Sequence, residues 1–300
     1  MMKLSHESKV RLGVGIGAFV LIIGLVFGIS RTLIHFDGPW DLDDVVSGLS
    51  GMDDVDDEDD HLDGGNYSDR PQQLSSATFD EGAFQSLDLN VTSGTVEVKC
   101  VSGGPVRVIE SGRVAKGASA SDAATQNLAK IEGSTLKISQ FDCDDERAHD
   151  RKVTIELPRE LADNMMGITA NVGSGDLTVA GIACHDLDVT LDSGDVEFTG
   201  TVTDTLNAEV GSGDVTFELY QAPAKSMDVS VGSGDVEMTV PNSTGFKASL
   251  TLGSGDFESD FLPLGYDGET ISSLEFDNGD KSATYRFEVG SGDMSFDSEY

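Results

Sequence analysis

Residues 187–217 decide the fold, and they read LDVTLDSGDVEFTGTVTDTLNAEVGSGDVTF. This stretch holds two similar turns, 192–195 and 211–214, whose final aspartates are 19 residues apart. Apolar residues stand eight, six and four positions before the final aspartate of each turn, and one and three positions after it. The residues between them are mostly polar. Alternation with a period of two predicts strands that bury one face.

The same turn recurs along the second half of the chain. The copies are 173–176, 192–195, 211–214, 232–235, 253–256 and 290–293. Their final aspartates are 19, 19, 21, 21 and 37 residues apart, so the last gap predicts a turn without the motif or a longer loop. One such unit cannot bury its apolar face alone, whereas stacked units bury a continuous core. We therefore expect an all-β fold, a parallel β-solenoid (β-helix-like, right-handed) with coils of about 20 residues. A meandering antiparallel sandwich is the alternative.

The region before the repeats is less regular. Residues 87–98 form a degenerate copy around Ser93-Gly94-Thr95, and the alanine-rich stretch 118–129 predicts a helix. Strands are predicted at 106–109, 136–139 and 153–157. Because the terminal units of solenoids are atypical, 76–166 is expected to be the first part and cap of one domain that extends over 76–300.

The opening LDLNVTSGTVEV (87–98), the segment VTIELP (153–158) and the serial SGD turns together resemble a known family. The chain is similar to the bacterial β-strand-repeat domains of unknown function named "putative adhesin", which include LiaG-like membrane-anchored proteins of Gram-positive envelope-stress operons. The resemblance covers residues 79–300. It implies an extracytoplasmic location and a β-helix-like fold, and it implies no activity or catalytic residues.

A membrane anchor is expected near the N-terminus. Residues 12–29 form an uncharged apolar run that would span roughly 27 Å as a helix. Basic residues precede this run and acidic residues accumulate after it, so the positive-inside rule places residues 1–11 in the cytoplasm and the remainder outside the cell. We expect a single-pass, uncleaved signal anchor at 12–30. A cleaved signal peptide is the alternative, which the length of the run disfavours.

This predicted helix carries regularly spaced glycines, and an acidic segment follows it. Gly13, Gly17, Gly24 and Gly28 would lie on one helical face, which suits a homodimer or pairing with another membrane protein. After the helix, residues 31–75 are expected to be an acidic disordered tether. Its segment 53–63, DDVDDEDDHLD, lacks the spacing of an EF-hand loop and is interpreted as a solvated spacer.

Charge and cysteine content exclude several functions. The chain has 54 acidic residues against 19 basic ones and a formal net charge of -35, so nucleic acid is excluded as a partner. Cys100, Cys143 and Cys184 form no CxxC pair, which argues against a disulfide framework or a zinc site. A Cys100–Cys143 bridge is one option, and free thiols are the simpler one. We assign no cofactor and no metal site.

Stacking of the repeats would align the aspartates of the repeated turns. The expected ladder is Asp176, Asp195, Asp214, Asp235 and Asp256. Neighbouring carboxylates would repel one another by roughly 0.8 kcal/mol each in water. A hydrogen bond from each aspartate to its own turn would return about 1.5–3 kcal/mol. The ladder is therefore interpreted as structural, with weak calcium binding as the alternative.

Catalysis is not expected. The repeated serines have no histidine at a matching position, and only four basic residues follow position 166: Lys225, Lys247, Lys281 and Arg286. Binding candidates are the segments that break the repeat: 220–225 (YQAPAK), 241–246 (PNSTGF), 261–266 (FLPLGY) and Cys184-His185. For 261–266, a loop that covers an open edge of the core is the simpler interpretation.

Two classes of function follow. The first is a non-enzymatic cell-surface interaction or adhesion module that binds an unknown protein or glycan. The second is an accessory component of a bacterial envelope-stress system that acts through the anchor.

Overall fold

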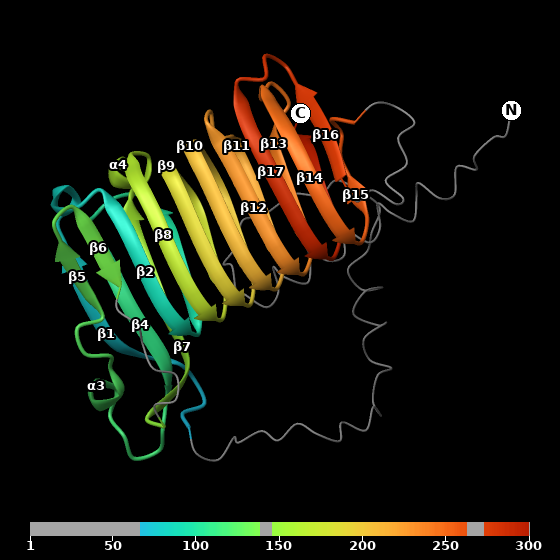
Figure 1. Ribbon diagram of the computed structural model, residues 1–300. Coiled ribbons are helices and arrows are strands. Elements are labelled where there is room, and N and C mark those ends of the chain that lie inside the picture. The colour runs from blue at the N-terminus through green and yellow to red at the C-terminus, as the bar shows by residue number, and fades with distance from the viewer. Residues whose placement is uncertain (1–66, 139–145, 263–272, 300) are drawn as a thin grey trace, which may run out of the picture. The chain divides into compact units, whose positions relative to one another are not determined.

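The computed structural model describes residues 67–138, 146–262 and 273–299 (Figure 1). These residues belong to one compact unit, Leu62–Tyr300. The unit is an all-β parallel solenoid whose 18 strands form one hydrogen-bonded sheet. The coils wrap this sheet into two facing rows of strands, called here the first and second sheets, and apolar side chains fill the space between them. This confirms the predicted fold class, while right-handed coiling stays a prediction.

Two sheets run the length of the unit. Neighbouring strands of the first sheet are β5 (Ala129–Glu132), β6 (Thr135–Ile138), β2 (Ser86–Ser93), β8 (Met165–Ser174), the second halves of β9 (Leu177–Ser193) and β10 (Val196–Ser212), β12 (Ser226–Ser233), β17 (Ala283–Ser291), β14 (Phe246–Ser254) and β16 (Ser273–Asn278). Neighbouring strands of the second are β1 (Gln72–Phe79), β4 (Val106–Val114), β7 (Ala148–Pro158), β3 (Thr95–Val101), the first halves of β9 and β10, β11 (Val215–Gln221), β13 (Val236–Pro241), β18 (Met294–Glu299) and β15 (Phe257–Glu258).

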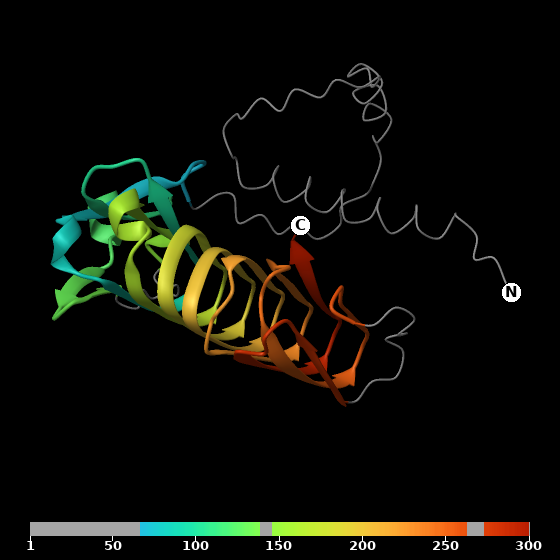
Figure 2. The same ribbon diagram turned by 90° about the horizontal axis from the view of Figure 1, so that it is seen from above.

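The predicted alternation is present strand by strand. In the second half of β9, Leu187, Val189 and Leu191 are buried while the residues between them face outward. Their partners across the ladder lie 19 residues later, since Leu187 pairs with Leu206 in β10. β9 and β10 run through the far corner of the coil as continuous arcs, which Figure 2 shows. In these two coils the chain therefore turns sharply only at the Gly-Ser-Gly-Asp side.

The order of the last coils differs from the sequence order. β17 lies between β12 and β14, and β18 lies between β13 and β15, so the last repeat sits inside the stack (Figure 1). The predicted succession of Asp235 and Asp256 as neighbours is therefore wrong. The physical reason is β16, which pairs antiparallel with the outer edge of β14 and covers it. The last repeat can then pair with β14 only on its other side. This also explains the long gap between the last two turns.

The N-terminal end is closed by an irregular cap. β1, β4 and β7 pair antiparallel beside β3, and β5 and β6 form an antiparallel pair beside β2. The helix predicted at 118–129 is only the short α3 (Ala120–Ala123), and residues 129–132 form β5, so that prediction is wrong over most of its length. β1 begins before the expected domain boundary at 76 because Leu74 packs in a small apolar cluster of the cap.

The C-terminal end is closed by aromatic side chains. The ring of Phe246 stacks on Tyr285 at 5.1 Å and meets Phe261 and Phe296 edge-on at 5.0 and 5.4 Å between centroids. Tyr285 is in register with Met227 and Leu206 of the middle coils, whereas Phe296 continues a row that includes Phe217. The rings fill the core beneath the last coils.

In the part of the chain that the structure describes, no helix is long and apolar enough to cross a membrane. The predicted helix at 12–30, its glycine face and most of the predicted tether lie outside the described residues.

Candidate functional site

The corner made by the repeated turn is held by close backbone contact. The second glycine of each Gly-Ser-Gly-Asp turn has a φ between 119° and 132°. A Cβ atom on Gly213 would overlap the carbonyl oxygen of Gly194 in the neighbouring coil. Glycine is therefore required here for two reasons: the backbone conformation and the close approach of the neighbouring coil.

The aspartates of the turns form a ladder of hydrogen bonds between coils. The backbone N–H of Asp214 donates to Asp195 Oδ1 at 3.0 Å, and that of Asp293 donates to Asp235 Oδ1 at 2.8 Å. The expected bond from each aspartate to its own turn is thus wrong. Because the turns stack in register, the nearest free N–H belongs to the next coil. The ladder runs in the order Asp176, Asp195, Asp214, Asp235, Asp293 and Asp256.

This ladder gives a prediction for Asp214. Alanine at this position removes the acceptor for the N–H of Asp235 and should lower the free energy of unfolding by about 1 kcal/mol. Asparagine keeps an oxygen acceptor and removes a charge that lies between two like charges, so it should leave stability equal or higher. Urea unfolding of both variants is the measurement. Equal losses in the two variants would show that the acceptor is not what the ladder contributes.

The outer face of the second sheet carries alternating hydroxyl and carboxylate groups. Two positions after each turn, successive neighbouring strands present Glu97, Thr178, Glu197, Thr216, Glu237, Ser295 and Glu258. Two positions further on, Glu218 lies between Thr199 and Thr239. We call these two rows the alternating face. A hydroxyl between carboxylates doubles their separation to about 10 Å and roughly halves their repulsion.

The alternation could have been found in the sequence. Successive repeats carry Glu-x-Thr, Thr-x-Glu and Glu-x-Thr from 197, 216 and 237. The observed coil order preserves the alternation, because Ser295 separates Glu237 from Glu258. If β15 paired directly with β13, those two carboxylates would be neighbours.

The alternation breaks at β18. The backbone N–H of Asp260 donates to Asp297 Oδ1 at 3.3 Å, so two aspartates lie side by side. Burial raises the pKa of Asp297, and the charges of Asp260, Glu258 and Glu237 raise it further, against the effect of that backbone hydrogen bond. The ionised form of Asp297 is therefore disfavoured in the folded protein.

A pH-dependent effect follows for Asp297→Asn. Since the folded pKa exceeds the ordinary value of 3.8, ionisation at neutral pH costs stability that is regained as pH falls through the folded pKa. The variant should melt higher than wild type at pH 7, and the difference should shrink toward pH 4. Glu209→Gln on the first sheet is the control and should change the melting temperature little. A variant that is less stable at pH 7 would contradict the assignment.

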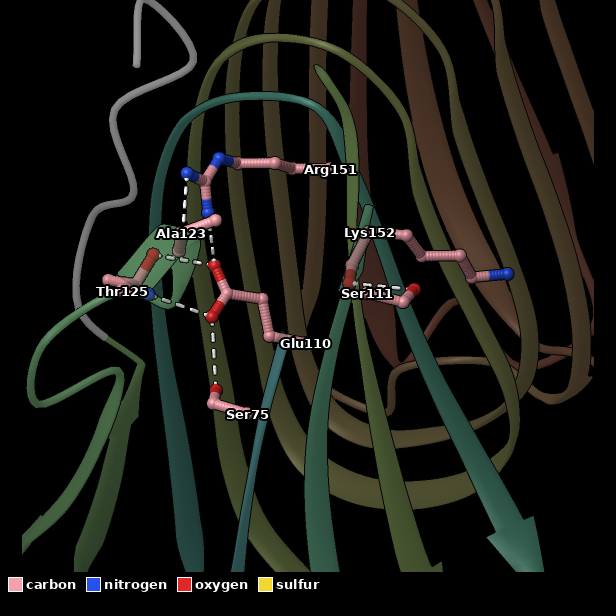
Figure 3. Close-up of polar contacts among 7 residues, drawn as sticks. All are labelled: Ser75, Glu110, Ser111, Ala123, Thr125, Arg151 and Lys152. Atoms are coloured by element: carbon pink, nitrogen blue, oxygen red, sulfur yellow. Dashed lines mark hydrogen bonds and ion pairs between the residues drawn. The ribbon is translucent and has the colours of Figure 1, made fainter. Parts of the chain in front are cut away.

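A buried ion pair joins the strands of the cap (Figure 3). Arg151 Nη1 donates to Glu110 Oε1 at 2.6 Å, and the two side chains are 2% and 0% exposed. The Glu110 carboxylate also accepts from Ser75 Oγ at 3.0 Å and from the backbone N–H and Oγ1 of Thr125 at 2.9 and 2.6 Å. Arg151 Nη2 donates to the Ala123 carbonyl at 2.9 Å. The cluster fixes the segment around α3 to β1, β4 and β7, and it is sealed from solvent, so its role is structural.

Sequence reasoning missed this ion pair, although a signal existed. Along β4, Val106, Val108 and Val114 face inward, and Glu110 stands in the same phase. An acidic residue at a buried position predicts a buried partner.

The cysteine and histidine candidates do not converge on a metal site. Burial raises the pKa of Cys184 to about 12, with a contribution from the charge of Asp186, so its thiol stays protonated. His185 Nδ1 lies 3.3 Å from Thr203 Oγ1. Cys100 is half-buried and free, whereas Cys143 lies outside the described residues. Within 67–138, 146–262 and 273–299, no group of three or more His, Cys, Asp or Glu is placed to hold a metal ion.

The segments that break the repeat differ from one another. Phe261 and Leu262 pack against the core, as the simpler interpretation expected, and 263–266 lie outside the described residues. In 241–246, the carbonyls of Asn242 and Thr244 accept from Asn278 Nδ2 at 3.1 and 2.8 Å. In 220–225, Tyr220 is 55% exposed at the end of β11, on the same sheet as the alternating face. Among the described residues of these segments, Tyr220 carries the exposed aromatic side chain.

One hollow of about 330 Å³ lies where the first turn meets β7. Ser93, Thr95 and His149 are among its lining residues. His149 Nδ1 lies 2.5 Å from Oδ1 of Asp150, its neighbour in the chain.

These features define the class: a two-sheet parallel β-solenoid with stacked turns and polar outer faces. The chain belongs to the Toastrack DUF4097 family, whose sequence model matches residues 64–296. This confirms the resemblance to adhesin-like repeat domains of unknown function. No curated protein matches the chain.

The solved structures to which the chain is similar are distant in sequence. A putative cell adhesion protein from Clostridium sporogenes is 14% identical, with 77% of this chain and 100% of that chain covered and a TM-score of 0.42. A putative adhesin from Bacteroides fragilis is 12% identical, with 76% and 98% covered and a TM-score of 0.35. A putative lipid binding protein from Parabacteroides distasonis is 10% identical, with 78% and 98% covered and a TM-score of 0.31.

Proposed function

We propose that this chain is a non-enzymatic, single-pass membrane protein of the cell surface, whose solenoid is an interaction or adhesion module for a surface protein or glycan. The observation that carries the proposal is the alternating face. It offers an extended array of hydroxyl donors and carboxylate acceptors on a sheet, with Tyr220 exposed at one border. A broad polar surface of this kind suits a large partner better than a small substrate, which binds in a concave pocket.

The charge of the solenoid narrows the chemistry of the partner. After Arg159 the basic residues are Lys225, Lys247, Lys281 and Arg286, and three of these contact an aspartate: Lys225 Nζ is 2.8 Å from Asp204, Lys281 Nζ is 2.7 Å from Asp277, and Arg286 Nη1 is 3.3 Å from Asp228. The alternating face therefore favours partners that bring basic groups or many hydroxyl groups.

Adhesion of cells that display the full-length chain tests the proposal. Glu197→Lys with Glu218→Lys changes the alternating face, and Asp188→Lys with Glu209→Lys makes the same charge change on the first sheet. Binding to arrays of surface proteins and glycans should fall at least tenfold in the first variant and remain in the second. Equal losses would assign the effect to net charge, and binding unchanged in both would reject the alternating face as the interaction surface.

A role as an accessory component of an envelope-stress system is the second candidate. The spacing of Gly13, Gly17, Gly24 and Gly28 favours it, because an adhesin needs no special face on its anchor. Proximity labelling on intact cells, with the native anchor or an unrelated one, separates the two roles. Partners that disappear when the native anchor is replaced belong to the helix. Partners that are labelled with either anchor belong to the solenoid.

Weak calcium binding along the aspartate ladder is the third candidate. One carboxylate oxygen of Asp195, Asp214 and Asp235 already accepts a backbone N–H, which leaves one oxygen from each for a cation. Calcium takes six to eight oxygen ligands, so we expect millimolar calcium to leave the melting temperature of the protein unchanged. A rise that magnesium does not reproduce would assign a calcium site to the ladder.

A further inference from the structure

We propose that the coil formed by β17 and β18 is exchangeable between molecules, so that the partner of this coil can be a second copy of the same chain. The proposal goes beyond the surface role above and is independent of it. We use "slot" for the position between the coil β12–β13 and the coil β14–β15, which β17–β18 occupies.

The slot is defined by four parallel strand pairings. β17 pairs with β12 on one side and β14 on the other, and β18 pairs with β13 and β15. Ser291 lies opposite Ser233 in β12 and opposite Ser254 in β14. The last coil to appear along the chain is therefore enclosed between two coils that precede it.

Every contact that holds the coil is available in the same form from another molecule. At the turn, the N–H of Asp293 donates to Asp235 Oδ1 and Asp293 Oδ1 accepts from the N–H of Asp256, each at 2.8 Å. Gly292 lies against Gly234 on one side and Gly255 on the other. These contacts require only the shared register of the repeat, so a second chain satisfies them equally well.

Side chains make the slot selective for this coil. Tyr285 and Phe287 are buried, and the Tyr285 hydroxyl donates to the Pro223 carbonyl at 2.8 Å. Arg286 Nη1 lies 3.3 Å from Asp228 on the first sheet. On the second sheet, Ser295 keeps Glu237 apart from Glu258. Direct closure of β14–β15 on β12–β13 would lose all of these contacts, which favours an occupied slot.

The connection to the coil is a strained turn. Residues 279–282 join β16 to β17, and Lys281 there has a φ of 59°. Residues other than glycine adopt this backbone conformation only at a cost in conformational energy. The turn is fastened by Ser282, whose Oγ donates to the Gly245 carbonyl at 3.3 Å. An extended connection that delivers β17–β18 to a second molecule relieves the conformation of Lys281. Exchange should therefore happen while chains fold together, before each slot is filled.

Disulfide trapping between full-length chains tests the exchange. One chain carries Ser233→Cys and the other Ser291→Cys, both with the native cysteines replaced, and the two are unfolded together and refolded under mild oxidation. The residues face each other on neighbouring strands, a separation that a disulfide spans. We expect a mixed disulfide dimer whose ratio to monomer rises about tenfold for a tenfold rise in protein concentration during refolding.

The control places both cysteines in one chain. That chain should form an intramolecular bond, and a mixture that yields no mixed dimer beside an efficient control would overturn the proposal. Failure of the control would overturn it as well, because β17 would then not lie beside β12.

The turn supplies a second, independent measurement. Lys281→Gly removes the strain of the closed turn and should lower the fraction of exchanged dimer several-fold. Asn127→Gly relieves a similar conformation, with a φ of 54°, at a site far along the chain and should leave that fraction unchanged. Equal effects of the two variants, or none from Lys281→Gly, would remove the turn from the mechanism and contradict the proposal.

Discussion

Alanine in place of Gly213 is expected to cost about 4 kcal/mol or more of the free energy of unfolding, enough to unfold a domain of ordinary stability. The added Cβ would overlap the carbonyl oxygen of Gly194, and the residue would have to keep a φ of 132°. Neither problem can be relieved locally, because the carbonyl belongs to a backbone that itself pairs with a further coil. Circular dichroism during thermal unfolding measures the effect.

Gly117→Ala is the matched control. Gly117 also has a positive φ, 93°, but a Cβ there would meet nothing within 4 Å. It should therefore show the conformational cost alone, about 1–2 kcal/mol. If the two variants lost equal stability, the close approach of the coils would not be the reason for glycine at the turn.

Arg151→Met is expected to destabilise the protein by about 3–5 kcal/mol. The substitution keeps much of the volume but leaves Glu110 without its cationic partner at a site that is 0% exposed. The hydrogen bonds from Ser75 and Thr125 remain, and they do not replace a full positive charge. We expect the segment around α3 to detach first, because it is held through Thr125 and Ala123. Hydrogen exchange at residues 119–125, together with thermal unfolding, measures this.

Two further variants separate charge from packing. Arg107→Ala breaks a pair in which the arginine is exposed and Glu156 is half-buried, with Nη2 2.9 Å from Oε2, and should cost less than about 1 kcal/mol. Replacing Glu110 by leucine together with Arg151→Met should recover most of the lost stability, because no charge is then left buried. A double variant as unstable as the single one would show that packing, and not the unpaired charge, is responsible.

The strands and their inward faces could be predicted from the sequence because one short rule governs them. A period of two tied to the turn assigns Leu187, Val189 and Leu191 to the core, and the structure places all three there. The position of the sharp corner follows in the same way from the repeated glycines. These features depend on residues within one repeat, so the sequence of a single repeat is enough to predict them.

The order of the coils could not be predicted on the same grounds. All copies share one register, so the backbone of β14 fits beside β12 as well as beside β17. What decides the order is the antiparallel return of β16, which depends on contacts between segments far apart in the chain. The predicted ladder therefore omitted Asp293. The prediction also placed the hydrogen bond of each aspartate within its own turn. In the structure, the N–H that donates to each aspartate belongs to a neighbouring coil, so a single repeat does not reveal it.

The candidate surface was only partly foreseen. Outward polar positions and their alternation are both present in the sequence of the repeats, whereas the neighbour of each strand at the last coils is known only from the structure. Tyr220 was one member of a candidate segment, and its exposure distinguishes it from Phe261, which packs against the core. The apolar pattern does not mark Glu110, because a carboxylate there interrupts the row of inward valines in β4.

The enclosed position of β17–β18 bears on how the protein would respond to a mechanical load. A stack of coils that is pulled at its last residue ordinarily peels from the free end, one ladder at a time. Here the last strands are flanked on both sides, so withdrawing them breaks two ladders in each sheet at once. Tension on the C-terminal strand would thus be shared by the coils on either side of it, and the outermost coil would not be the first to give way.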